Sequence, residues 1–315
     1  MINTNFKYQR NDISGFTLVE IMISLMLGLF LLALSVQSVI TMNKHFLHTR
    51  QMAQVQETGR FVYALIARDI EQVKYWRSLL PFINISGTSL LTEPNSFSCE
   101  EAGTSWAREL NLSVFGLNDS AAGYSCIAND DYLHSDILTL RSLSFLTSKS
   151  YDNEQLYLRL DNSQARLFLG ADRSNSANND LTNANTYIVE AHSYYIGDSN
   201  RFCQGNKIPA LYWQTIVNGR PQQQELLAGV EHMQVQFAID TDNDLVANKL
   251  VSANTVNDWR HVIGIDVDIL VRSECPNSNH RDNKAYKIGD INYQVNDNFY
   301  RKKYAYSFSL LNPTN

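Results

Sequence analysis

The chain carries the stretch Gly15-Phe16-Thr17-Leu18-Val19-Glu20, and the 23 residues from Ile21 to Asn43 that follow it contain no charged side chain. An uncharged helix of that length covers roughly 35 Å, which exceeds the hydrocarbon core of a bilayer, about 30 Å. Glu20 therefore lies at the start of a membrane-length helix, where an unpaired carboxylate is costly in lipid. The stretch predicts that Glu20 has a charged partner.

The only suitable processing point lies before the apolar helix, between Gly15 and Phe16, after a short segment with the basic residues Lys7 and Arg10. An ordinary secretory signal is cut after its apolar stretch, which is then lost from the mature chain. Cleavage after Gly15 instead leaves the helix on the mature protein. It also gives Phe16 a new amine about one helical turn from Glu20. We expect that amine, from the same chain or from a neighbouring one, to pair with the carboxylate.

This pattern resembles the class III signal of type IV prepilins, in which a prepilin peptidase cuts after the glycine and methylates the new N-terminal phenylalanine. The resemblance implies cleavage between Gly15 and Phe16, N-methylation of Phe16, and charge pairing by Glu20 during assembly. A plain signal anchor with an accidental glutamate is the alternative. The spacing of the three residues relative to the apolar run disfavours it.

Charge sets the expected topology. Because Lys7 and Arg10 precede the helix, the N-terminus is expected in the cytoplasm and the chain beyond about Asn43 in the periplasm. The formal net charge is -6, and Lys and Arg are scattered rather than clustered. Direct nucleic-acid binding usually needs a basic surface, so we do not expect it.

Four cysteines lie in the part of the chain that is expected to be exported: Cys99, Cys126, Cys203 and Cys275. An even number in an oxidising compartment fits two disulfides, for which three connectivities are possible. We expect the local pairs, Cys99 with Cys126 and Cys203 with Cys275. No two cysteines are close enough in sequence for a C-x-x-C zinc or redox motif, which favours structural bridges.

Helical periodicity continues beyond the apolar run. An apolar stripe at helical spacing precedes Pro81, which is expected to end the helix. The sequence predicts a single helix from residue 16 to about 78, about 90 Å long, with Gly59 as a weak point at which it could bend. The stripe consists of Val62, Ile66, Ile70 and Val73, and its polar companions include Arg60, Arg68, Asp69 and Lys74.

From about residue 82 the sequence changes to alternating strands and polar loops. Apolar alternation predicts half-buried strands of antiparallel sheets at 156–160, 233–239, 263–271 and 304–310, with further strands at 136–146, 165–169, 186–196 and 210–217. Surface loops are expected at 116–131, 172–185 and 274–284. The expected organisation is a leader (1–15), a transmembrane or filament-core half of the helix (16–43), its amphipathic half (44–80) and a periplasmic β-rich domain (81–315). The fold class is therefore α+β.

The sequence gives little support for catalysis or metal binding. The seven histidines are dispersed, and there is no H-E-x-x-H, G-x-S-x-G, Walker or dinucleotide motif. Asp240, Asp242 and Asp244 alternate as in a calcium loop, but Leu245 and Val251 stand where an EF-hand needs glycine and glutamate. The sequence favours a plain acidic turn. A calcium site of another kind, completed by Asn248 or Asp258, is the alternative.

Several later segments strengthen the resemblance to pilins. They are Thr58-Gly59-Arg60-Phe61, Leu65 to Ile70, Tyr75-Trp76, Tyr194 to Gly197, Leu227 to Val235, Val262 to Arg272 and Tyr304 to Asn312. In this order they resemble the PilW family of type IV pilus minor pilins. That resemblance implies a type IV pilin-like fold, in which a long N-terminal helix packs on a large antiparallel β-rich domain.

The same resemblance implies a non-enzymatic subunit that primes pilus assembly at or near the tip, with roles in twitching motility, adhesion and DNA uptake. The implied partners are other minor pilins, the major pilin, a PilY1-like tip adhesin, the prepilin peptidase and the inner-membrane assembly platform. Two other classes stay open. One is a pseudopilin of type II secretion, and the other is a membrane-anchored periplasmic enzyme or binding module.

Overall fold

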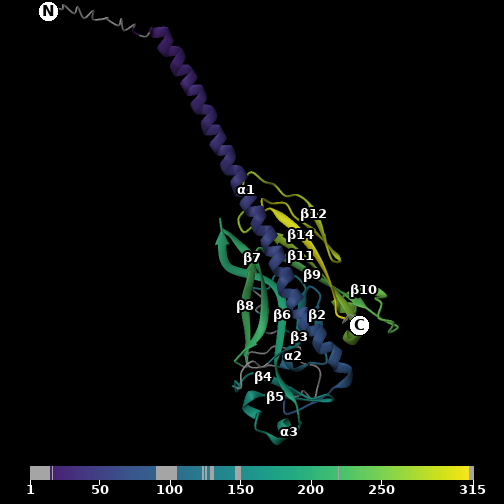
Figure 1. The fold of residues 1–315 in the computed structure, drawn as a ribbon. Helices are drawn as coiled ribbons and strands as arrows, with labels where there is room; N and C mark the ends of the chain where they lie inside the picture. The colour runs from purple at the N-terminus through teal and green to yellow at the C-terminus, as the bar shows by residue number, and fades with distance from the viewer. Residues whose placement is uncertain are drawn as a thin grey trace, which may run out of the picture. The chain divides into compact units, whose positions relative to one another are not determined.

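Helix α1 (Leu18–Leu79) opens the fold (Figure 1). The computed structural model describes residues 15, 17–89, 105–122, 124, 126–127, 131–145, 150–218 and 220–311. The predicted helix is confirmed within two residues at each end. It stops before Pro81, which lies in a short 3₁₀ helix (Leu80–Phe82) and cannot donate the backbone hydrogen bond that a continuing α-helix requires.

The chain divides into two compact units, residues 1–50 and 51–315, and the boundary falls inside α1. In the first unit every described side chain from Thr17 to Arg50 is exposed, although most of them are apolar. By length and composition, α1 is the one helix in the described chain that could cross a membrane.

The second unit contains a β-rich domain with a large and a small sheet. In its described part, the eight-stranded sheet has the order β1-β5-β4-β6-β3-β2, with β7 paired to β6 and β8 paired to β7. All pairs are antiparallel except β1 with β5. The bounds are β1 Asn84–Ser86, β2 Val114–Leu117, β3 Ile137–Phe145, β4 Leu156–Leu160, β5 Gln164–Leu169, β6 Asn185–Cys203, β7 Asn206–Val217 and β8 Arg220–Ala228.

The four-stranded sheet has the order β10-β9-β11-β14 and is antiparallel throughout. A separate hairpin, β12 (Ala285–Ile288) with β13 (Ile291–Gln294), follows β11. Short helices α2 (Ser105–Arg108) and α3 (Ser176–Asn179) lie in connections. The four strands are β9 Val230–Ile239, β10 Lys249–Ser252, β11 Val262–Arg272 and β14 Arg301–Ser309. The predicted α+β class, a long helix with a large antiparallel-rich β domain, is confirmed.

The apolar stripe of α1 forms the centre of one core. Val62, Ile66 and Val73 are fully buried against β9 and β11 residues such as Val235 and Val267. Fully burying an aliphatic side chain of this size contributes about 1.5–3 kcal/mol. The amphipathic part of α1 is therefore held in place mainly by its sheet contacts. A second core, which includes Trp76 and Trp106, lies against the eight-stranded sheet.

Gly59 is a packing position, and α1 is continuous through it. A Cβ atom at Gly59 would lie 2.5 Å from the ring of Tyr304 on β14. The Tyr304 hydroxyl donates to the Val55 carbonyl (3.2 Å), and the Tyr306 hydroxyl donates to the Gly59 carbonyl (2.7 Å). The glycine therefore lets two tyrosines of β14 reach the helix backbone.

Candidate functional site

We call residues 15–43 the assembly segment. Its helix begins with the first turn of α1. The Glu20 amide donates to Thr17 Oγ1 (3.3 Å), and the Ile21 amide donates to the Thr17 carbonyl (3.2 Å). Thr17 is thus the N-cap, and Thr17-Leu18-Val19-Glu20 has the capping-box pattern Thr-x-x-Glu. An acidic side chain in the first turn also interacts favourably with the helix dipole. Our prediction did not include this role of Glu20 at the helix N-terminus, although its spacing of three residues from Thr17 indicates a capping box.

The structure places Glu20 on an exposed first turn, with Gly15 just before it in sequence. Phe16, the predicted new N-terminus and methylation site, lies outside the described residues. Charge pairing by Glu20, like cleavage between Gly15 and Phe16, stays a prediction.

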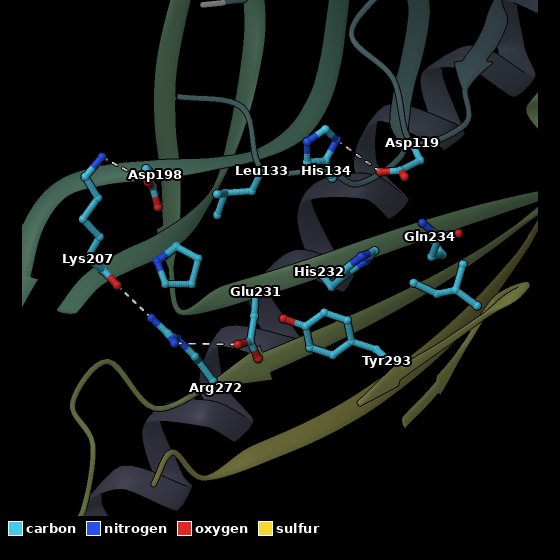
Figure 2. Close-up of a pocket in the computed structure, with 12 residues that line it drawn as sticks. Asp119, Leu133, His134, Asp198, Lys207, Glu231, His232, Gln234, Arg272 and Tyr293 are labelled. Carbon is cyan, nitrogen blue, oxygen red and sulfur yellow. Dashed lines mark hydrogen bonds and ion pairs between the residues drawn. The ribbon is translucent and has the colours of Figure 1, made fainter. Parts of the chain in front are cut away.

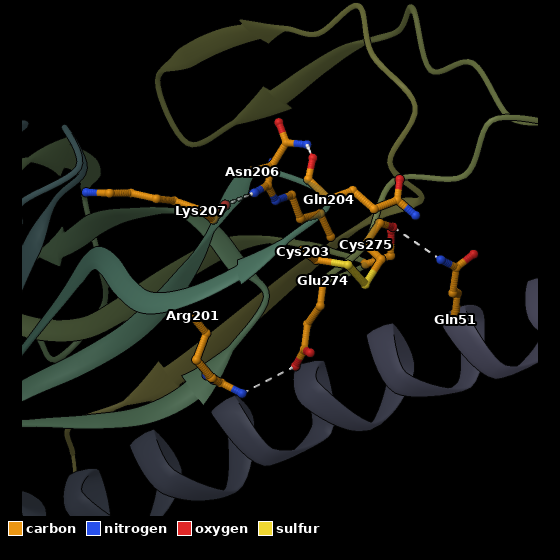
Figure 3. Close-up of a disulfide and its surroundings, with 10 residues drawn as sticks. Gln51, Arg201, Cys203, Gln204, Asn206, Lys207, Glu274 and Cys275 are labelled. Carbon is orange, nitrogen blue, oxygen red and sulfur yellow. Dashed lines mark hydrogen bonds and ion pairs between the residues drawn. A yellow bond between two sulfur atoms is a disulfide. The ribbon is translucent and has the colours of Figure 1, made fainter.

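The disulfide between Cys203 and Cys275 confirms one predicted pair (Figure 3). It joins the end of β6 to the segment after β11, and so links the two sheets across 72 residues of sequence. The Gln51 amide nitrogen donates to the Cys275 carbonyl (3.2 Å), and Asn277 Nδ2 donates to Gln51 Oε1 (3.2 Å). The linked segment is therefore also attached to α1 within the second unit. The other predicted pair, Cys99 with Cys126, stays a prediction because Cys99 lies outside the described residues.

The acidic turn after β9 brings its three carboxylates together. One oxygen from each of Asp240, Asp242 and Asp244 lies within 4.8 Å of the others. The Asp240 carboxylate, however, already accepts three backbone hydrogen bonds, from residues 242, 243 and 245, at 2.7–3.1 Å. Its main role is to close the turn.

Both residues proposed to complete a calcium site have other partners. Asn248 Oδ1 accepts from the amide and hydroxyl of Thr241 (2.6 and 2.8 Å). Asp258 pairs with Arg260, whose guanidinium holds the pKa of Asp258 at about 2. The geometry agrees with the plain acidic turn that the sequence favours, and calcium binding there stays a prediction.

A polar contact between α1 and the eight-stranded sheet corrects our assignment of Asp69 to the polar face. Asp69 is only 5% exposed. One of its oxygens accepts from the Tyr194 hydroxyl (2.6 Å) and lies 2.5 Å from His192 Nδ1. Burial, followed by the nearby Asp69 charge, raises the pKa of Tyr194. The burial of Asp69 could have been predicted from the sequence, because Asp69 lies seven residues after Val62 and thus on the buried stripe.

One pocket in the described part of the second unit has a volume of about 480 Å³ and is lined by residues of β7, β9, β11 and β13, among others (Figure 2). Four of its charged groups form two pairs, Lys207 with Asp198 (3.0 Å) and Arg272 with Glu231 (3.7 Å), and Asp119 faces His134 at 3.9 Å. Burial lowers the pKa of His232 in the same pocket and so favours the neutral ring. The two ion pairs therefore offset four of the charges in this pocket.

Ser135 and His232 beside this pocket resemble a nucleophile and base, with Ser135 Oγ 3.4 Å from His232 Nδ1. Ser135 is fully buried, and its hydroxyl donates to the Met233 carbonyl (2.5 Å) and accepts from the Met233 amide (2.7 Å). A hydroxyl held in this way has no proton available for a general base. The contact is therefore a structural link between β9 and the segment before β3.

Two family models match the chain. Residues 10–36 match the prokaryotic N-terminal methylation motif, which includes Gly15 and Glu20. Residues 186–312 match the type IV pilus-assembly protein W model, and this range runs from β6 to the end of β14. These two matches support a PilW-like minor pilin of type IV pili. Comparison with curated proteins and with solved structures found no match.

The two matches divide the PilW-like chain as its structure does. The methylation motif lies within the first unit, and the longer match lies within the second. The longer match includes the Cys203–Cys275 disulfide, His192 and the acidic turn. This PilW-like chain is therefore a structural subunit whose assembly segment and β domain are each identified by a separate match.

Proposed function

We propose that this PilW-like chain helps to initiate type IV pilus assembly as part of a priming complex at or near the pilus tip. The observation that carries the proposal is the assembly segment, in which Glu20 lies in the first turn of an exposed helix followed by 23 uncharged residues. Such a helix can leave the bilayer only if other helices cover its apolar surface. A carboxylate near its tip then favours one register over others, because misplacing it leaves a buried charge unpaired.

In this proposal the precursor crosses the inner membrane once, with its N-terminus in the cytoplasm and its β domain in the periplasm. The prepilin peptidase cuts it and the assembly platform extracts it. Its neighbours in the filament are other minor pilins, the major pilin and a PilY1-like adhesin. Twitching motility, adhesion and DNA uptake depend on the assembled pilus. The chain itself catalyses no reaction and requires no cofactor.

The test is Glu20→Ala in the native cells, with Glu57→Ala as the matched control, since Glu57 is an exposed glutamate on the same helix. We expect Glu20→Ala to reduce the number of surface pili and twitching, with normal levels of the protein in the membrane. The control should be fully piliated. A fully piliated and motile Glu20→Ala strain would contradict the proposal.

A pseudopilin of type II secretion is the second candidate, because it would use the same assembly segment. Deleting the gene separates the two functions. Loss of pili with normal secretion of enzymes supports the pilus, whereas loss of secreted enzymes with normal pili supports the pseudopilin.

A further inference from the structure

The turn between β9 and β10 presents two adjacent apolar side chains to solvent. Leu245 is 58% exposed and Val246 is 61% exposed. We call this pair the apolar tip. The exposed carboxylates of Asp242 and Asp244 lie beside it in the same turn, and we call these two the acidic rim.

Leu245 has a backbone conformation that is unfavourable for leucine. Its φ is +68°, and among the described non-glycine residues with positive φ it is the only apolar one, the others being Asp, Asn or Gln. A left-handed conformation costs a leucine roughly 1–2 kcal/mol, whereas glycine adopts it freely. Leucine at this position therefore weakens the fold and gains little from burial. Strain that the fold tolerates in this way is typical of functional positions.

The turn holds the tip rigidly. Asp240, only 3% exposed, accepts the Leu245 amide (2.8 Å) through one oxygen and the residue 242 and 243 amides through the other. The Val246 amide donates to Asp244 Oδ1 (2.8 Å). Thr241 and Asn248 close the base of the turn. These hydrogen bonds restrain the backbone of the apolar tip, so less conformational entropy remains to be lost on binding.

We propose that the apolar tip inserts into an apolar pocket, bordered by lysine or arginine, on a different pilin subunit. Charge selects this partner. The acidic rim is repelled by anionic lipid surfaces, which argues against membrane insertion. A second copy of this chain, with its net charge of -6 and the same acidic rim, would also be repelled. A rigid apolar centre with a charged border has the anatomy of a protein–protein binding hot spot.

The proposal rests on the proposed function, since it takes the partner from the same filament. It is tested in native cells with a photo-cross-linking amino acid at Lys249, an exposed residue of β10 that leaves the tip intact. We expect an adduct with another pilin subunit, at a site lined by apolar residues and by Lys or Arg. Adducts with lipid, with a second copy or with no protein would each overturn the proposal.

Leu245→Gly in the cross-linking chain separates binding from folding. It removes the apolar side chain and relieves the backbone strain, so we expect the adduct to decrease by about tenfold or more, equivalent to about 1.4 kcal/mol. The thermal midpoint of the purified full-length protein should stay the same or rise. An undiminished adduct would show that Leu245 does not bind the partner, and a lower midpoint would show that Leu245 serves the fold; either result would overturn the proposal.

Phe202→Ser is the matched control. Phe202 is 62% exposed at the end of β6, so the variant removes an equally exposed apolar side chain from another part of the surface, and the adduct should persist. Loss of the adduct in both variants would overturn the proposal. Failure of the proposed function is recognised separately, because Glu20→Ala would then assemble normally whatever the outcome at Leu245.

Discussion

Gly59 shows how one missing side chain positions a helix on a sheet. In an exposed helix, replacing glycine by alanine stabilises by about 1 kcal/mol. Here we expect Gly59→Ala to destabilise by about 1–3 kcal/mol, because the new methyl group would lie 2.5 Å from the Tyr304 ring, which is fixed by its bond to Val55. Chemical unfolding of the full-length protein in detergent measures the change. In a Tyr304→Leu background, Gly59→Ala should lower the free energy of unfolding much less. An equal loss of stability would show that the contact with Tyr304 is not its cause.

Asp69 holds two buried polar groups of β6. We expect Asp69→Ala to destabilise by about 3 kcal/mol, since it leaves the Tyr194 hydroxyl and His192 Nδ1 buried without their acceptor. Trp213 stacks on His192 at 3.9 Å, so tryptophan fluorescence reports on this site during unfolding. Arg68→Ala removes an exposed neighbour and should change stability by less than about 0.5 kcal/mol. Equal effects of the two variants would exclude the proposed role of Asp69.

Asp136 should make stability depend on pH. Burial raises its pKa from 3.8 to about 7, although the Val235 and Asp119 amides donate to it. Between about pH 4 and pH 7 the folded state therefore keeps a proton that the unfolded state has lost. Stability should fall as the pH rises through this range and level off above it. Asp136→Asn should remove this contribution to the slope, and an unchanged pH dependence of the thermal midpoint would contradict it.

At the scale of elements, apolar alternation located the longer strands that have an apolar face, but it did not locate β8 or the short strand β2, half of which fell within a predicted surface loop. β9 and β11 were predicted because they alternate apolar and polar residues. β8 was missed because its sequence, Arg-Pro-Gln-Gln-Gln-Glu-Leu-Leu-Ala, begins with six residues that show no apolar alternation. Its pairing is provided by β7, a long-range contact that local periodicity cannot reveal.

The same limit applies to the sites. The helix and its apolar stripe followed from spacing, but the partners of Gly59 and Asp69 lie more than 100 residues away. Periodicity indicates which face of a helix is buried, and it does not indicate what that face contacts. The apolar tip at Leu245 was missed for a different reason, because a positive φ at leucine has no sequence signature.

The Cys203–Cys275 disulfide restrains two elements at once, the end of β6 and the segment after β11. Closing a loop of about this size stabilises a protein by about 4 kcal/mol in the chain-entropy description, which is model-dependent. We expect the double variant Cys203→Ser/Cys275→Ser to lose about that much in chemical unfolding. Reduction of the native protein should produce at least this loss, because it opens the Cys203–Cys275 bridge together with any other disulfide. A double variant as stable as the native protein would contradict the prediction.

For the whole molecule, one continuous helix belongs to two units with opposite requirements. From Gln51 onward one apolar stripe of the helix is buried within the β domain, whereas from Thr17 to Arg50 every apolar side chain is exposed. The second unit therefore has its own apolar core, while the first depends on a bilayer or on other subunits to cover its apolar surface. Changes in the assembly segment should consequently alter assembly and leave the β domain folded.

That independence gives a prediction about Gly15 and Glu20. If cleavage after Gly15 supplies the amine that pairs with Glu20, a Gly15 variant that is not cut lacks the partner, and Glu20→Ala lacks the carboxylate. Gly15→Leu and Glu20→Ala should then cause similar losses of pili, and the double variant should lose no more pili than either, because both substitutions remove the same interaction.

Pilus counts measure assembly. Mass spectrometry of the N-terminal peptide should show N-methylated Phe16 in the wild type and an uncut leader in Gly15→Leu. Additive losses of pili in the double variant, or cleavage of the Gly15→Leu leader, would contradict the prediction that the two residues act through one interaction. The thermal midpoint of the β domain should be the same in all four chains, since neither residue lies in the second unit.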